Sequence, residues 1–171
     1  TIPAVMMRTM TGHFRIPNVE FHSKAVYTNN PFAGSFRGYG NVQATYVTAT
    51  LMDKMAEELG MDPIEFRLKN AQKPGERTPQ NSLLKTAALA DCIKIGAEKT
   101  NFLEKHAANV AAREKPGRIR QGIGIATSIH NAGGAKIHKS DGCGTILTMD
   151  DYGRATVITG ASEIGQGIDA V

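Results

Sequence analysis

The spacing of apolar and polar residues changes twice along this chain. Between residues 1 and 28, large apolar residues alternate weakly with polar ones, and two prolines interrupt them. This pattern predicts one or two strands with irregular connections. The best strand candidate is residues 21–27, because its apolar side chains and β-formers fit a half-buried sheet. It leads directly into a glycine-rich loop at residues 29–43.

Helical spacing follows that loop. Apolar residues recur every three or four positions and predict one stripe of an amphipathic helix, formed by Val42, Tyr46, Ala49, Met52, Met55, Ala56 and Leu59. Asn41 is placed to cap this helix and Gly60 to end it. A second helix is predicted over residues 62–70, because it opens with DPIE, which combines an N-cap, a preset φ and a capping-box acid.

A third helix is predicted over residues 86–98, after a polar connection at residues 71–85. Cys92 falls on the apolar face of this helix, so we expect it in the core. Further helix is expected from residue 102 toward residue 112, and the Pro116–Gly117 pair ends it.

The spacing then becomes alternating again. Strands are predicted at residues 120–129, 145–149 and 155–159, with a hairpin turn at residues 150–154. Extended segments followed by helices and then strands indicate an α+β fold with a mixed or antiparallel sheet. We expect two parts: residues 1–115 with the glycine-rich loop and the helices, and residues 116–171 rich in strand.

Composition narrows the class of protein. The 171 residues suffice for one full-sized domain or two small ones, and 41% hydrophobic and 21% charged residues are near average for globular proteins. No apolar run approaches the ~20 residues needed to cross a bilayer. The start of the chain lacks a signal-peptide pattern and an initiator methionine, so we expect a segment of a longer protein.

Charge and cysteine content argue against a nucleic-acid-binding protein and against a cysteine-ligated metal site. The formal net charge of +4 is dispersed, and the densest basic patch, residues 113–120, lacks the long basic stripe or the aromatics typical of nucleic-acid binding. The two cysteines, Cys92 and Cys143, lack metal-ligand spacing. We expect a cytoplasmic protein with no membrane or nucleic-acid partner.

Two glycine-rich loops carry the candidate chemistry. The first, NNPFAGSFRGYGNVQ at residues 29–43, places three glycines, two aromatics and Arg37 directly before a helix. Glycine allows close backbone approach, arginine presents a rigid fork of donors, and a helix N-terminus offers unpaired amides. The second loop, GASEIGQG, occupies residues 160–167. The pair suits a ligand with many hydrogen-bonding edges, although a glycine-rich connection over the core would have the same composition.

The second loop also matches a dinucleotide fingerprint. Gly165, Gly167 and Ala170 satisfy G-x-G-x-x-A, but the first glycine follows the strand too late and the preceding strands look hairpin-connected. A dinucleotide-binding domain is therefore the least favoured alternative.

Three segments of the chain carry a family resemblance. PFAGSFRGYGNVQ, EELGMDPIEFRLKN and TGASEIGQG together resemble the molybdenum-binding large subunit of the xanthine dehydrogenase and aldehyde oxidoreductase family, which includes 4-hydroxybenzoyl-CoA reductase-type members. The resemblance covers essentially the whole chain. It implies an internal fragment whose two parts both belong to a larger molybdopterin-binding region.

The resemblance also implies a role for particular residues. The implied cofactor-binding residues are Ser35, Phe36, Arg37, Gly165, Gln166 and Gly167. Ser35 and Phe36 would offer backbone contacts near the metal's oxygen ligands, and Arg37 would form hydrogen bonds with the cofactor. Residues 165–167 would hold the pyranopterin. Tyr39 matches the aromatic residue that lines the substrate pocket. Gly34 stands where carbon monoxide dehydrogenases have a cysteine, which argues against oxidation of carbon monoxide.

No catalytic residue and no protein ligand to the metal is expected within the chain. The family's general-base glutamate would lie downstream of Val171, and Glu163 would stabilise its loop.

The implied chemistry is hydroxylation of a carbon centre with water as the oxygen source, or the reductive reverse. The substrate would be an aromatic heterocycle, an aldehyde or an aryl-CoA. Molybdopterin, as such or as its cytosine dinucleotide, would bind here, and iron–sulfur clusters and FAD would belong to partner domains or subunits. The chain alone is expected to be inactive. A non-catalytic structural or interaction fragment without cofactor stays open as the alternative.

Overall fold

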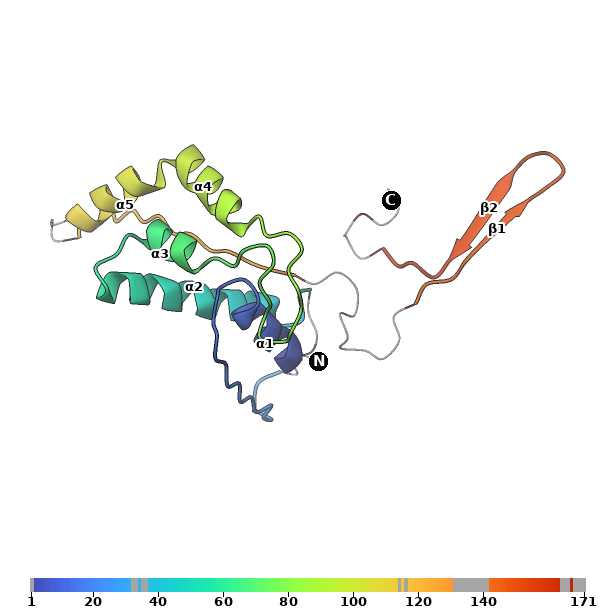
Figure 1. Cartoon of the computed structure of the whole chain (residues 1–171), viewed down its shortest axis with the longest axis horizontal. Helices are drawn as coiled ribbons and strands as arrows, with labels where there is room; N and C mark the ends of the chain where they lie inside the picture. The colour runs from blue at the N-terminus through green and yellow to red at the C-terminus, as the bar shows by residue number, and fades with distance from the viewer. Residues whose placement is uncertain are drawn as a thin grey trace. The chain divides into compact units, whose positions relative to one another are not determined.

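The computed structural model describes residues 2–31, 34, 37–113, 115, 117–130, 142–163 and 167. The chain divides into two compact units, Thr1–His130 and Asn131–Val171, and each is described by itself. The first unit contains five helices and the second contains a two-stranded sheet within the described residues (Figure 1). This architecture confirms the predicted α+β class, with an antiparallel sheet. The domain boundary expected at residues 115 and 116 stays a prediction.

The helices of the first unit pack in sequence order. They are α1 (Ile2–Thr11), α2 (Asn41–Glu58), α3 (Pro63–Asn70), α4 (Leu89–Thr100) and α5 (Phe102–Ala111). Each helix contacts the next along the chain, and α3 lies between α2 and the α4–α5 pair (Figure 1). Ile64, Ile93 and Phe102 form the core between α3, α4 and α5.

The prediction of strands in residues 1–28 is wrong. Residues 2–11 form α1, in which Val5 and Thr9 are buried one helical turn apart against α2. The proline at position 3 is tolerated because it lies in the first turn, where no backbone donor is needed. Residues 21–27 are irregular and mostly exposed, and no described strand pairs with them. Their β-forming side chains therefore have no sheet to join.

The apolar stripe predicted for α2 is only partly correct. The buried positions follow a spacing of four and include Ala44, Thr48, Met52 and Ala56. Small side chains let α2 lie close to its neighbours, so the larger Tyr46 of the predicted stripe is left 73% exposed. The predicted stripe members Val42, Met55 and Leu59 are exposed as well.

The ends of the helices confirm several local predictions. The Asp62 carboxylate accepts hydrogen bonds from the amides of Ile64, at 2.8 Å, and Glu65, at 2.9 Å. Gly60 has a φ of 62°, as expected for the residue that ends α2. Cys92 of α4 is exposed, so its predicted place in the core is wrong, and the neighbouring Ile93 is buried instead.

The segment after α5 is extended but forms no strand. Residues 120–129 have no strand partner among the described residues, so this predicted strand is wrong. The segment lies along the helices because Ile123 and Ile125 pack on the core and Arg67 Nη2 donates to the Ile125 carbonyl at 3.1 Å. Side-chain contacts thus replace the expected sheet hydrogen bonds.

The second unit contains the predicted hairpin. Strands β1 (Thr145–Met149) and β2 (Ala155–Thr159) pair antiparallel, with Leu147 opposite Val157. The Asp150 carboxylate fixes the turn by accepting hydrogen bonds from the amides of Tyr152 and Arg154. No helix in the described part of the chain is both long and apolar enough to cross a membrane.

Candidate functional site

The first glycine-rich loop ends in an unusual turn. Gly38, Tyr39 and Gly40 have φ angles of 93°, 52° and 101° in succession. Positive φ is uncommon for a residue with a side chain, so Tyr39 is held in this conformation by its surroundings. The Asn41 amide donates to the Gly38 carbonyl at 2.8 Å and closes the turn at the start of α2.

Helix α1 fixes this turn from one side. Gly40 is buried, and a Cβ atom placed on it would lie 2.8 Å from Ile2 Cγ2 and 2.8 Å from Met6 Cγ. Any side chain at this position would push α1 away from α2. The turn therefore depends on close packing as well as on the backbone freedom of glycine.

Asn41 has a different role from the predicted one. It is the first helical residue, the N-cap position belongs to Gly40, and no side chain among the described residues caps the helix. The Asn41 carbonyl oxygen Oδ1 instead accepts a hydrogen bond from Ser128 Oγ at 2.7 Å, and its Nδ2 donates to the Ile129 carbonyl. The predicted cap is wrong because the side chain is turned toward residues 128–129. Its hydrogen bonds there hold the start of α2 against this segment.

The start of α2 is consequently suited to an anion. Its first turn carries no acidic residue and no capping side chain, so the positive end of an 18-residue helix is not neutralised there. Arg37, in the adjoining turn, is exposed and adds a guanidinium group. Molybdopterin carries a phosphate and a pterin with several hydrogen-bonding edges. A guanidinium, backbone amides and an uncapped helix end fit those groups.

The same turn presents an aromatic surface. The side chain of Tyr39 is 43% exposed, so part of its ring is available for contact with a flat molecule. Arg37 and Tyr39 are thus the two predicted site residues that the structure places together, in one turn before α2. Ser35 and Phe36, from the same loop, lie outside the described residues.

In the second loop, Gly167 forms a hydrogen bond with Glu163. Gly167 has a φ of 83°, and its amide donates to the Glu163 carboxylate at 3.2 Å. This contact agrees with the expectation that Glu163 stabilises the loop. A Cβ atom on Gly167 would meet no described atom within 4 Å, so the described residues leave this backbone open to a ligand. Gly165 and Gln166 lie outside the described residues.

Among the residues that the structure describes, no three His, Cys, Asp or Glu side chains lie close enough to hold a metal ion. The dinucleotide alternative loses its structural context, because β1 and β2 form an antiparallel hairpin rather than two parallel strands joined by a helix. The hydrogen bond between Asn41 and Ser128 is not predicted from the sequence, because the two residues are 87 positions apart and Ser128 belongs to no motif.

Comparison with known proteins identifies the family. Two family models, each described as a molybdopterin cofactor-binding domain, match residues 1–71 and residues 95–171. The xanthine dehydrogenase molybdenum-binding subunit of Escherichia coli O157:H7 is 33% identical over 156 residues, which cover 88% of this chain and 20% of that protein. The aldehyde oxidoreductase of Megalodesulfovibrio gigas is 32% identical over 157 residues, 91% of this chain and 16% of that protein.

A solved structure agrees with the sequence relatives. The crystal structure of the aldehyde oxidoreductase from Desulfovibrio desulfuricans matches with a TM-score of 0.54 and 28% identity, over 72% of this chain and 13% of that one. The chain spans about one fifth of the length of the curated relatives it matches. Both glycine-rich loops fall inside the matched domains. The chain therefore belongs to the family of molybdenum-binding subunits of xanthine dehydrogenases and aldehyde oxidoreductases, and residues 1–71 and 95–171 match molybdopterin cofactor-binding domains.

Proposed function

We propose that the whole protein is a molybdopterin-dependent oxidoreductase that hydroxylates a carbon centre with water as the oxygen source, or catalyses the reductive reverse. Its substrate is an aromatic heterocycle, an aldehyde or an aryl-CoA. The names of the relatives, xanthine dehydrogenase and aldehyde oxidoreductase, support the first two classes. The bound cofactor supplies the metal centre at which the carbon is oxidised or reduced.

The observation that carries this proposal is the turn of residues 37–40 at the uncapped start of α2. In our proposal the Arg37 guanidinium would donate hydrogen bonds to the phosphate or to a carbonyl of the cofactor. The backbones of Ser35 and Phe36 would offer contacts near the metal's oxygen ligands. The backbone and amide groups of residues 165–167 hold the pterin from the second loop.

Tyr39 lines the substrate pocket in this proposal. Its ring offers a flat apolar wall to an aromatic substrate, and the turn restrains the backbone from which that ring projects. An aromatic wall favours planar substrates over aliphatic ones. Replacing Tyr39 by alanine is therefore expected to raise KM for a planar substrate more than for a small aliphatic aldehyde.

The partners of the protein follow from the same proposal. Partner subunits or domains of the enzyme would carry iron–sulfur clusters and FAD, which would supply the electron transfer. We place the enzyme in the cytoplasm, a proposal supported by the two free thiols Cys92 and Cys143.

Metal and pterin analysis of the purified full-length protein tests the proposal. We expect molybdenum and pterin in equal amounts, bound to the protein through gel filtration. A protein that is folded and contains neither would support the alternative, a structural or interaction role without cofactor. Titration with NAD should give no saturable binding to the 171-residue chain, and saturable binding would revive the dinucleotide alternative.

A further inference from the structure

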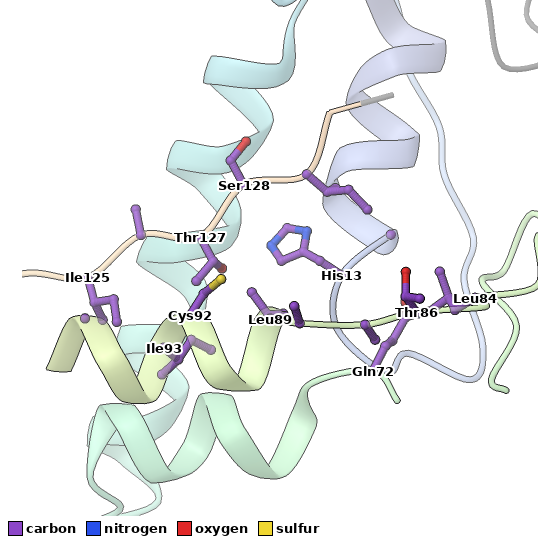
Figure 2. A pocket seen from close by; sticks show the side chains of 16 residues that line it. His13, Gln72, Leu84, Thr86, Leu89, Cys92, Ile93, Ile125, Thr127 and Ser128 are labelled. Atoms are coloured by element: carbon purple, nitrogen blue, oxygen red, sulfur yellow. The ribbon is translucent and has the colours of Figure 1, made fainter. Parts of the chain in front are cut away.

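The first unit contains a cavity that the proposed cofactor turn does not use. It lies between the turn after α1, the start of α4 and residues 125–129, and its volume is about 530 Å³ (Figure 2). This volume falls within the range of small-molecule sites, about 300 to 1,000 Å³. Apolar side chains, including Leu89, Ile93 and Ile125, form much of its wall.

Two buried polar side chains in this wall are incompletely paired. His13 is only 4% exposed. The Thr9 backbone lies near enough to act on the pKa of the ring, but neither ring nitrogen makes a hydrogen bond of normal geometry within the described part of the chain. Gln72 is 6% exposed, and its carbonyl oxygen Oε1 also has no partner among the described residues. Figure 2 shows the His13 ring projecting into the cavity. Buried polar atoms are nearly always paired, so these three atoms are available to pair with a polar ligand.

The described residues that line the cavity are uncharged, which favours an uncharged ligand. Burial lowers the pKa of His13 to about 4, and the nearby Thr9 backbone only partly opposes this. The imidazole is therefore uncharged at neutral pH and offers one donor and one acceptor. The described lining contains no Asp, Glu, Lys or Arg. A charged molecule would lose its hydration here without gaining an opposite charge.

We propose that this cavity binds an uncharged aromatic molecule that carries an amide-type donor and acceptor. Its polar edge pairs with His13 and Gln72, and its ring packs on Leu89, Ile93 and Ile125. These residues are distinct from those proposed to bind molybdopterin. The wall at residues 125–129 is nevertheless connected to the cofactor turn, because Ser128 hydrogen-bonds to Asn41.

The thiol of Cys92 can report whether the cavity is occupied. Cys92 is an exposed thiol that lines the cavity, and Cys143 is an exposed thiol in the second unit. Alkylation of each by N-ethylmaleimide can be followed by peptide mass spectrometry on the full chain. We expect benzamide to slow alkylation of Cys92 several-fold in a saturable manner and to leave Cys143 unchanged. Benzoate has a similar shape but is charged and has no donor, so it should not protect Cys92 at the same concentrations.

Two substitutions test the polar contacts. His13→Phe keeps a ring but removes both nitrogens, and Gln72→Met removes the carbonyl. Each should weaken protection by benzamide about tenfold, because a polar group of the probe is left unpaired. Protection by toluene should not weaken. Replacing an unpaired buried polar group by an apolar one is tolerated, so both variants should fold with an unchanged or higher Tm.

Absence of saturable protection by benzamide would overturn the proposal, as would equal protection by benzoate or unchanged affinity in both variants. The test needs no molybdenum, so its failure leaves the proposed oxidoreductase function standing.

Discussion

Replacing Arg67 by methionine should destabilise the first unit by about 3 kcal/mol. The Arg67 side chain is completely buried and joins α2, α3 and the extended segment after α5. Its Nη1 lies 2.8 Å from Asp53 Oδ1 and donates to the Pro63 carbonyl at 3.2 Å, and its Nη2 donates to the carbonyls of Ala49, at 3.2 Å, and Ile125, at 3.1 Å.

The magnitude follows from the surroundings of each partner. Breaking a fully buried ion pair costs about 3 to 5 kcal/mol, because the remaining charge is left without a partner. Here the side chain of Asp53 is 51% exposed, so water would solvate its carboxylate and the loss falls at the lower end. Methionine keeps most of the apolar stem, so the substitution adds no large cavity. The Ile125 carbonyl loses its hydrogen bond from α3, so among the described residues the extended segment is held there only by the packing of Ile123 and Ile125.

Urea unfolding followed by helical circular dichroism measures this loss. The matched control is Arg113→Met, because Arg113 pairs with Glu57 at 3.3 Å while both side chains are more than 60% exposed, at 63% and 71%. An exposed pair contributes about 0 to 1 kcal/mol, so the control should barely change the midpoint. Equal losses for the two variants would refute the reasoning that burial gives Arg67 its importance.

Two further predictions concern the turn and the buried histidine. Gly40→Ala should cost about 2 kcal/mol or more, because the new Cβ would overlap two side chains of α1 at a φ of 101°. Gly60→Ala, at a φ of 62° with no described atom within 4 Å of the new Cβ, should cost only about 1 kcal/mol in the same urea unfolding assay, and equal costs would contradict the close packing. The pKa of His13 falls from 6.5 to about 4 on folding. Between pH 4 and pH 6.5, His13 therefore carries a proton in the unfolded chain that it does not carry in the folded chain. Stability should therefore decline by about 3 kcal/mol as the pH drops from 6.5 to 4. His13→Phe should remove this component of the decline, and an identical pH profile would show that His13 is not buried in its neutral form.

Local signals in the sequence predicted the ends of elements well. The DPIE start of α3, the Gly60 end of α2 and the β1–β2 hairpin all appear as expected, because each is fixed by contacts within a few residues. The same is true of the turn at residues 37–40, whose glycines and Arg37 were recognised as one motif.

Contacts between distant segments account for the failures. The side chain of Asn41 was predicted to cap its own helix, but Ser128 and Ile129, more than 80 positions away, hold it instead. Residues 2–11 alternate weakly enough to suggest a strand, yet packing on α2 stabilises a helix. The His13 cavity needs four separate segments to form, around residues 12–13, 72, 84–96 and 125–129, and spacing along the chain does not reveal it.

The central claim is that Arg37 helps to hold molybdopterin at the start of α2. The most direct test is the pterin content per protein molecule, measured on the full-length wild type and on Arg37→Gln. Arg118→Gln is the control, because Arg118 is also exposed but lies outside both loops. We predict that Arg37→Gln loses most of its bound pterin, while the control keeps the wild-type amount and both variants keep the wild-type Tm of the first unit. Wild-type pterin content in Arg37→Gln, or an equal loss in both variants, would contradict the account.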